Sequence, residues 1–271
     1  MSLIEFKNVY KIFGKHPLKA LARIKAGATK EEVLKETGNS IALNNINLAI
    51  DKGEIYVVMG LSGSGKSTLV RHINRLIDPT AGEIIVKDKN IIHFSNKMLR
   101  EYRRHTVSMV FQRFGLLPHK TVFQNIEFVL MIKGISKADA KEKSNYWIEK
   151  VGLSGYSDFY PKQLSGGMQQ RAGLARALAV DTEIIIMDEP FSALDPLIRG
   201  DMQSILLSLQ EELHKTIVFI THDFAEAIKI GKKLTIIKDG EIEQTGTSEE
   251  IINTPVSEYI QGFVNSIGQL N

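Results

Sequence analysis

A glycine-rich loop carries the clearest chemistry in the sequence. Residues 60–67 read Gly-Leu-Ser-Gly-Ser-Gly-Lys-Ser and match the pattern G-x-x-x-x-G-K-[ST]. The glycines let the backbone turn its N–H groups toward phosphate oxygens, and Lys66 supplies a positive charge. The hydroxyl of Ser67 can reach Mg²⁺, while Thr68 offers an oxygen near the α-phosphate. The predicted nucleotide-binding residues are Gly60, Leu61, Ser62, Gly63, Ser64, Gly65, Lys66, Ser67 and Thr68, here called the phosphate loop.

Two adjacent carboxylates follow an apolar run typical of a buried strand. Ile184–Met187 leads directly into Asp188 and Glu189. At the tip of a strand beside a phosphate loop, Asp188 can hold Mg²⁺ through water, and Glu189 can orient or deprotonate the attacking water. We therefore expect Asp188 to serve the metal and Glu189 to serve catalysis.

A second segment has the composition of an anion site. Ser165 and the two glycines after it begin a helical pattern that continues through Leu174 and Leu178. Glycines at a helix start let phosphate approach the free backbone N–H groups. By spacing alone, Ser165 is equally an ordinary helix N-cap. The residues of this segment, here called the signature segment, are Leu164, Ser165, Gly166, Gly167, Met168 and Gln169.

The base is expected to be adenine. A guanine-specific site needs an Asn-Lys-x-Asp motif, and the Asn96-Lys97 pair is followed by Met98 and Leu99 instead.

Short β-branched runs alternate with amphipathic stretches, which favours an α/β fold with a largely parallel sheet. The expected strands are Ile4–Val9, Ile46–Ile50, Ile55–Met59, Glu83–Val86, Thr106–Val110, Ile184–Met187, Ile217–Ile220, Leu234–Lys238 and Glu241–Thr245. Asp239-Gly240 is expected to form a hairpin turn between the last two. Between Gln112 and Leu164 the pattern becomes helical, with Asn125–Lys133 and Lys137–Val151 the clearest stretches.

The expected organisation is a core of residues 1–111 and 165–246 with a helical subdomain at 112–164 and a helical tail at 247–271. Residues 15–40 form a small helical insertion, with a capping box from Thr29 to Glu32 and an end at Gly38. The phosphate loop should open a helix that includes Leu69, Ile73 and Leu76.

Composition excludes several classes. The 34 Lys and Arg against 31 Asp and Glu leave a charge of +3, which is too balanced for a dedicated nucleic-acid protein. The basic cluster Arg103-Arg104-His105 is expected to be a solvated helix end. No cysteine is present, which removes disulfides, thiolate catalysis and Cys-ligated zinc. The sequence has neither a long apolar run nor a signal-peptide layout, and we expect a cytosolic location.

The phosphate loop, the Asp188-Glu189 pair and the signature segment occur in the order seen in the ATPase subunits of ABC transporters, together with Gln112, Ser192–Asp195 and His222. The resemblance to these subunits covers nearly the whole chain. The resemblance implies a single ABC ATPase domain over 1–271, with a P-loop NTPase (RecA-like) core, an antiparallel β portion and an inserted helical subdomain. The resemblance also implies that Gln112 contacts Mg²⁺ and the attacking water, and that His222 reaches the γ-phosphate. An aromatic residue stacks on adenine, with Phe13 the first choice and Tyr10 the second.

The resemblance also implies an ATP-dependent homodimer. Two subunits pack head to tail, so that the signature segment of one closes over ATP held by Lys66 of the other. The residues expected along the seam are Ser192, Ala193, Leu194 and Asp195. Met168 departs from the Gln that this family usually has there.

A narrower resemblance is to the ATPase subunits of glycine betaine/proline betaine importers. It is carried by the insertion after Phe13-Gly14 and by the segments Met59–Gly65, Asn74–Ile77, Phe111–His119 and Ser192–Arg199. It implies a membrane permease that docks near Phe114–Thr121, an extracytoplasmic solute-binding protein, and a peripheral place on the cytoplasmic face of the membrane. The 25 residues after Gly246 have no room for the CBS modules of many members.

These residues do not determine the transported solute, and choline, carnitine, trimethylamine N-oxide or an amino acid are alternatives. A soluble ABC ATPase of translation or DNA repair is a distant alternative. It would normally carry two cassettes or a long coiled-coil insertion.

Overall fold

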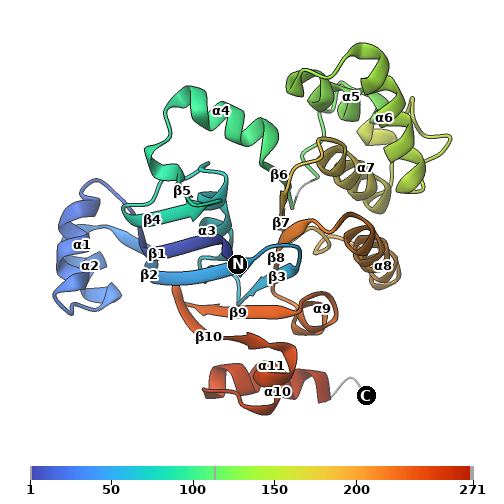
Figure 1. The fold of residues 1–271 in the computed structure, drawn as a ribbon. Helices are drawn as coiled ribbons and strands as arrows, with labels where there is room; N and C mark the ends of the chain where they lie inside the picture. The colour runs from blue at the N-terminus through green and yellow to red at the C-terminus, as the bar shows by residue number, and fades with distance from the viewer. Residues whose placement is uncertain (1, 113, 269–271) are drawn as a thin grey trace. The chain divides into compact units, whose positions relative to one another are not determined.

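The computed structural model describes residues 2–112 and 114–268 (Figure 1). Arg113 of the Phe111–His119 segment and residues 269–271 of the expected tail lie outside the described residues. The chain divides into two compact units. Unit 1 comprises residues 1–52, 56–99 and 222–271, and unit 2 comprises residues 53–55 and 100–221.

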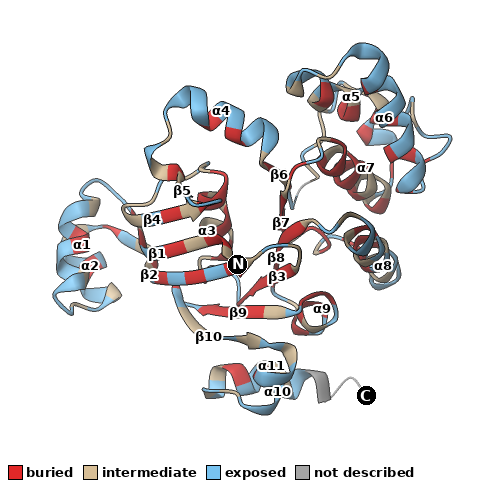
Figure 2. Cartoon of the chain, in the orientation of Figure 1, coloured by how far each residue is buried: buried red, intermediate tan, exposed pale blue. Residues whose placement is uncertain are grey.

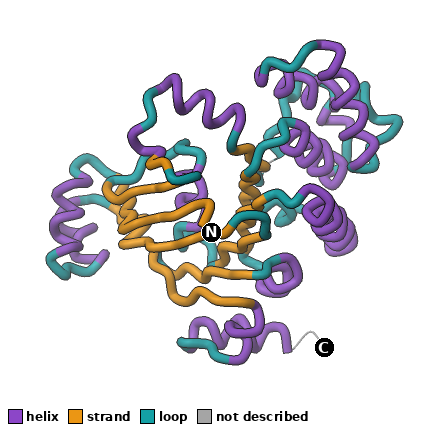
Figure 3. Tube along the Cα trace, in the orientation of Figure 1, coloured by secondary structure: helices purple, strands orange, loops and turns teal. Residues whose placement is uncertain are grey.

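Helices and strands are interspersed along the chain, and Figure 3 distinguishes them by colour. Unit 1 contains β1 (Ser2–Phe13), α1 (Pro17–Lys25), α2 (Lys30–Thr37), β2 (Ser40–Asp51), most of β3 (Ile55–Met59), α3 (Lys66–Ile73), β4 (Ala81–Val86), β5 (Lys89–Asn90), η1 (Ile91–His93), α9 (Phe224–Ile230), β9 (Lys233–Lys238), β10 (Glu241–Thr247), α10 (Ser248–Asn253) and α11 (Glu258–Gly268). Unit 2 contains β6 (Val107–Val110), α5 (Val122–Lys133), α6 (Lys137–Lys150), η2 (Pro161–Gln163), α7 (Gly166–Ala179), β7 (Ile184–Asp188), α8 (Pro196–Leu213) and β8 (Thr216–Thr221). Helix α4 (Asn96–His105) begins in unit 1 and ends in unit 2.

Unit 1 contains an antiparallel sheet with the order β2-β1-β4-β5. Strands β1 and β2 are longer than the sequence predicts, since they pair from Ser2 opposite Asp51 to Phe13 opposite Ser40. Ser40 therefore belongs to β2 rather than to the insertion. Register shifts interrupt the pairing, for example between Phe6 and Val9. Each shift breaks the period-2 pattern, which explains why the sequence revealed only part of each strand.

The expected hairpin is confirmed in the same unit. Strands β9 and β10 pair antiparallel from Lys238 opposite Glu241, and β3 pairs with β9 in parallel. The turn residues Asp239 and Gly240 have φ of 47° and 75°. Positive φ at both central positions is what a tight type I′ hairpin requires.

In unit 2, strands β6, β7 and β8 pair in parallel. Every residue of β7 and β8 is buried, as expected for strands of a parallel sheet covered on both faces (Figure 2). The described residues of 112–164 contain α5, α6 and η2 and no strand. The mixture of parallel and antiparallel strands with helices confirms the α/β class.

The insertion forms two helices. The capping box at the start of α2 is present, because Glu32 N–H donates to the Thr29 hydroxyl and Thr29 N–H donates to the Glu32 carboxylate. Gly38 ends α2 with φ of 66°, the left-handed conformation of a helix cap. The helices pack on β1 around a small core of Tyr10, Ile12, Ala20, Leu21 and Val33.

Helix α3 ends earlier than expected. Ile73 is its last residue, Asn74 caps it, and Arg75 takes φ of 52°. Leu76 therefore lies outside the helix and is 51% exposed. The cluster Arg103–His105 is the exposed end of α4, as predicted. Within the described residues, no helix combines the length and the apolar character needed to cross a membrane.

Candidate nucleotide site

The phosphate loop follows the fully buried strand β3 and leads into α3. Two of its glycines, Gly60 and Gly65, are required by space as well as by conformation. A Cβ on Gly60 would lie 2.2 Å from the Ile237 carbonyl oxygen, and one on Gly65 would lie 2.6 Å from the Ala42 carbonyl oxygen. The φ angles are 153° at Gly60, 83° at Gly63 and 104° at Gly65. A larger residue at Gly60 or Gly65 would therefore collide with the backbone, whereas at Gly63 only the positive φ favours glycine.

The loop is closed by contacts to its own backbone. The Leu61 carbonyl accepts from Ser64 N–H at 3.2 Å and from Lys66 Nζ at 2.8 Å. Gly240 N–H, in the β9–β10 turn, donates to the Ser64 carbonyl at 2.9 Å. Lys66 is 3% exposed. The ammonium group is thus held inside the loop, at the start of a helix whose first N–H groups favour an anion.

His72 is a buried residue within this helix that the sequence pattern did not single out. Its Nδ1 lies 2.6 Å from the Thr68 carbonyl oxygen. Burial lowers the pKa of His72 to about 4, and the hydrogen bond to Thr68 opposes that shift. The ring is therefore neutral at neutral pH, with Nδ1–H donating to Thr68. The spacing of four residues from Thr68 on the buried face of α3 is the signal that could have revealed it.

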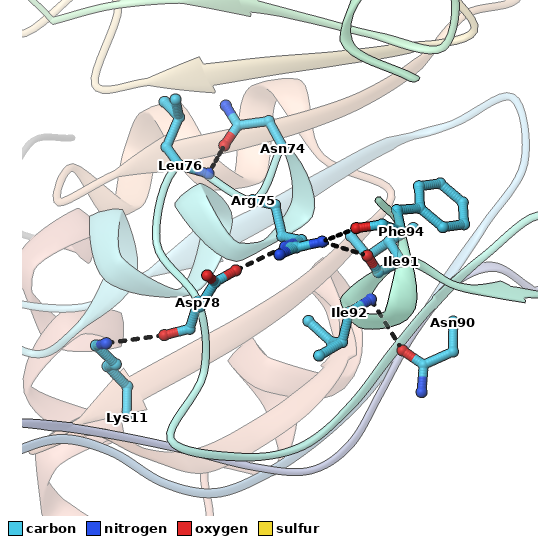
Figure 4. Close-up of polar contacts among 9 residues, drawn as sticks. All are labelled: Lys11, Asn74, Arg75, Leu76, Asp78, Asn90, Ile91, Ile92 and Phe94. Carbon is cyan, nitrogen blue, oxygen red and sulfur yellow. Dashed lines mark hydrogen bonds and ion pairs between the residues drawn. The ribbon is translucent and has the colours of Figure 1, made fainter. Parts of the chain in front are cut away.

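An arginine fixes the other end of α3. Figure 4 shows Arg75 between Asp78 on one side and two backbone carbonyls on the other. Its Nε donates to Asp78 Oδ1 at 2.6 Å, and its Nη1 donates to the carbonyls of Ile91 and Phe94, each at 3.0 Å. Lys11 Nζ donates to the Asp78 carbonyl at 2.8 Å. The segment Asn74–Ile77, identified only by resemblance, thus has a structural role at the end of the phosphate-loop helix.

The two aromatic candidates for the base differ in exposure. Phe13, at the end of β1, is 44% exposed, and Lys11 Nζ lies 4.9 Å from its ring centroid. Tyr10 is 9% exposed and belongs to the core under α1 and α2. Only Phe13 has a free area that a base could cover.

In unit 2, the acid pair lies at the end of β7. Asp188 is 2% exposed, whereas Glu189 is half-buried. Glu189 has φ of 47°, an unusual conformation for a non-glycine residue and one found often at functional sites. The Glu189 carbonyl accepts from Ser192 Oγ at 3.0 Å, and Gln112 Nε2 donates to Glu189 Oε2 at 3.3 Å. The structure therefore brings Gln112, Glu189 and Ser192 together.

The signature segment opens α7. Ser165 is the N-cap, and its hydroxyl accepts from Met168 N–H at 3.3 Å. Gln169 Nε2 donates to the Leu164 carbonyl at 3.2 Å. The backbone N–H of Met168, rather than its side chain, therefore makes the capping contact. A cavity of about 280 Å³ lies beside this turn and is lined by Gly152, Leu153, Tyr156, Ser165, Gly167, Met168, Arg171 and Ile198.

Helix α7 also holds the loop after Gln112. Arg176 Nη1 donates to the Gly115 carbonyl at 2.6 Å, and Nη2 donates to the Phe114 carbonyl at 3.4 Å. Phe114 and Gly115 both have positive φ, 53° and 61°. The loop expected to contact a permease is thus anchored to the helix that carries the signature segment.

The segment 192–195 turns into α8. Asp195 caps this helix, with its carboxylate accepting from Ile198 N–H at 3.0 Å, and Pro196 occupies the first turn. Leu194 is buried and Ala193 is exposed. His222, the residue after β8, is exposed, and Asp223 after it caps α9.

The predicted residues divide between the two units. Unit 1 holds Phe13, the phosphate loop and His222. Unit 2 holds Gln112, Asp188, Glu189, the signature segment and residues 192–195. The residues expected to hold Mg²⁺ are Ser67, Gln112 and Asp188, which offer a hydroxyl, an amide and a carboxylate oxygen. Oxygen donors of this kind suit Mg²⁺.

Comparison with known proteins gives consistent matches. A model of the ABC transporter family matches residues 43–192. The chain is 51% identical over 264 residues to the glycine betaine transport ATP-binding protein OpuAA of Bacillus subtilis, covering 97% of this chain and 63% of that protein. It is 49% identical to the glycine betaine/proline betaine transport system ATP-binding protein ProV of Escherichia coli, covering 97% of this chain and 66% of that protein. The chain thus spans about two thirds of the length of these curated relatives.

A solved structure has the same fold. The dimeric, post-hydrolysis structure of the ATP-binding cassette MJ0796, bound to ADP and Pi, superimposes with a TM-score of 0.76 at 33% identity. The match covers 90% of this chain and 98% of that one. It confirms the P-loop NTPase fold that the resemblance to ABC ATPase subunits implied. With the family match over residues 43–192 and the similarity to relatives over 97% of its length, the chain belongs to the ABC transporter family of ATP-binding subunits.

Proposed function

We propose that the chain is the ATP-hydrolysing subunit of an importer that drives uptake of a compatible solute such as glycine betaine or proline betaine. The observation that carries the catalytic part is the contact of Gln112 Nε2 with Glu189 Oε2 at 3.3 Å, on a glutamate with φ of 47°. The similarity to OpuAA and ProV supports the solute.

The residues have separate roles in this proposal. The N–H groups of the phosphate loop and the ammonium of Lys66 hold the phosphates of ATP, and Phe13 stacks on adenine. Ser67, Gln112 and Asp188 would hold Mg²⁺, which would supply positive charge beside the phosphates. Glu189 accepts a proton from the water that attacks the γ-phosphorus, the bond to ADP breaks, and Gln112 orients that water. His222 contacts the γ-phosphate.

The assembly is part of the same proposal. Two copies pack head to tail, and the signature segment of each supplies N–H groups to the ATP held by the other. Residues 192–195 lie along the seam. The loop Phe114–Thr121 contacts a membrane permease on the cytoplasmic face, and a solute-binding protein delivers cargo from the opposite side.

The test is uptake of labelled glycine betaine into ATP-loaded vesicles that contain this chain, its native permease and its binding protein. Glu189→Gln removes the proton acceptor and should lower ATP hydrolysis by about 10²- to 10⁴-fold. Uptake should fall with it. Glu211→Gln, the same change at an exposed position of α8, is the matched control and should leave uptake at the wild-type rate.

Two results would contradict the proposal at different points. Hydrolysis at the wild-type rate in the Glu189→Gln variant would remove Glu189 from catalysis. ATP hydrolysis without betaine uptake would exclude betaine and direct the search to choline, carnitine, trimethylamine N-oxide and then amino acids.

A further inference from the structure

The C-terminal helix α11 reaches the phosphate loop through one side chain. Leu61 N–H donates to the hydroxyl of Tyr259 at 3.3 Å. The carbonyl of the same Leu61 accepts from Lys66 Nζ at 2.8 Å. The N–H and C=O of one residue therefore connect Tyr259, 198 positions away in sequence, to the lysine that carries the charge of the loop.

Aromatic packing fixes the tyrosine. Its ring meets Phe263 edge-on at 5.0 Å between centroids, and Phe263 packs on Phe224 at 6.0 Å. Lys238 Nζ lies 5.0 Å from the centroid of the Tyr259 ring. Since each of these contacts involves the ring, none of them requires the hydroxyl. The hydroxyl is thus available for Leu61 while the ring holds α11 in place.

The same aromatic packing extends to the segment that contains His222. Phe224 is the first residue of α9, two positions after His222, and it is 4% exposed. The row Tyr259–Phe263–Phe224 therefore connects the phosphate loop to the helix that follows His222. All of these residues belong to unit 1.

The hydroxyl keeps its proton. Burial raises the pKa of Tyr259, and the nearby carboxylates of Asp239 and Glu243 raise it further, against the opposing effect of the Leu61 hydrogen bond. A neutral phenol accepts one hydrogen bond from Leu61 without placing a negative charge beside the phosphate loop. A phenolate there would repel the anion that the loop is built to bind.

We propose that Tyr259 is a positioning residue of the phosphate loop: its hydroxyl holds the Leu61 backbone, and through it Lys66, in the conformation that receives ATP. The inference rests on the proposed function, because it requires the loop to bind ATP. It assigns α11 a direct part in nucleotide affinity, beyond the packing of Phe263 on Phe224 of α9.

The test is the variant Tyr259→Phe, which keeps the ring contacts and removes the acceptor. A net hydrogen bond of ordinary strength corresponds to an affinity loss of about two- to tenfold. The dissociation constant of a labelled ATP analogue and the KM for ATP should both rise by that factor, while kcat at saturating ATP stays within about twofold. The melting temperature without nucleotide should stay within about 2 °C of wild type.

Tyr146→Phe is the matched control. Tyr146 also meets a neighbouring ring edge-on, Trp147 at 5.3 Å, and has Lys150 Nζ 5.6 Å from its ring centroid. It lies on α6 in unit 2. Removing its hydroxyl should leave ATP affinity unchanged.

Three results separate the possibilities. If wild-type protein binds no ATP, the proposed function fails. If wild type binds ATP and Tyr259→Phe binds it equally well, only the positioning role fails. A second measurement uses the wild type alone and does not depend on folding of the variant. The Leu61 amide hydrogen should exchange more slowly than the amide of an unprotected loop residue. Exchange at the unprotected rate would overturn the inference.

Discussion

At the scale of single residues, burial keeps His72 of helix α3 uncharged. His72 is a fully buried residue of α3, with Nδ1 directed at the Thr68 carbonyl. Its pKa of about 4 in the folded chain lies below the ordinary 6.5. Between these two values the unfolded chain binds a proton that the folded chain does not. The stability due to the neutral ring is therefore complete above pH 6.5 and is lost as the pH falls toward 4.

This difference predicts a pH dependence. From pH 7.5 to pH 5.0 the free energy of unfolding should fall by about 2 kcal/mol through His72 alone. Urea denaturation of the wild type and of His72→Gln at both pH values measures it, because Gln does not titrate. The drop should be smaller in the variant by that amount. His105→Gln, on the exposed end of α4, is the control and should keep the wild-type drop. Equal drops in wild type and His72→Gln would disprove the buried neutral ring.

The residue scale also shows what a sequence can and cannot determine. Residue types and spacing were sufficient to predict roles for Lys66, Asp188 and Glu189, because phosphate chemistry restricts which residues can serve. They left Phe13 and Tyr10 open, because both are aromatic and near a strand end. Exposure separates them, at 44% and 9%, and exposure follows from how the insertion packs on β1. Such non-local packing has no local pattern in the sequence.

At the scale of elements, helix α3 is held at both of its ends. The phosphate loop opens it, and Arg75, in the turn after it, contacts Asp78 and two backbone carbonyls near η1 (Figure 4). The side chain of Arg75 is 15% exposed and its two carbonyl contacts are partly buried, whereas its partner Asp78 is 62% exposed. A planar guanidinium reaches three acceptors in different directions, which a lysine ammonium on a single flexible stem does not reproduce.

Arg75→Lys should therefore leave at least one of the carbonyls of Ile91 and Phe94 without its donor. We expect the free energy of unfolding to fall by about 1–3 kcal/mol, the cost of an unsatisfied buried acceptor. Chemical denaturation measures this. Arg104→Lys is the matched control, because Arg104 makes one exposed ion pair with Glu101, and its loss should stay within about 0.5 kcal/mol. Equal effects of the two changes would show that Arg75 is an ordinary surface arginine.

Element boundaries were predictable where the local pattern is regular. Strand β3 was predicted as Ile55–Met59 and is found there, since an apolar run bounded by glycine is unambiguous. The end of α3 was predicted too late, because the apolar spacing continues through Leu76 although Arg75 leaves the helical conformation. The side chain of Arg75 contacts residues 78, 91 and 94, which lie outside α3. The sequence pattern of α3 alone therefore does not reveal these contacts.

At the scale of the whole molecule, the proposed site needs two copies of the chain. Each copy carries a phosphate loop and a signature segment, so each homodimer has two composite sites related by symmetry. The helix cap at Ser165 allows a selective change. Ser165→Asp keeps the cap, because Asp and Ser are equally good N-caps, and places a negative charge where the partner's γ-phosphate would lie. Ser136→Asp makes the same change at the N-cap of α6 and should leave ATP hydrolysis unaltered.

Mixing this variant with Lys66→Ala tests the composite site. Each variant homodimer has two damaged sites and should be inactive. A mixed dimer has one site with intact Lys66 and an intact opposing Ser165, and one site with both changes. In a random 1:1 mixture about one quarter of all sites are therefore intact, and ATP hydrolysis should recover to about that fraction of wild type. Native mass spectrometry of the mixture measures whether mixed dimers form. If they form and hydrolysis does not recover, the signature segment acts within its own chain, and the head-to-tail arrangement is wrong.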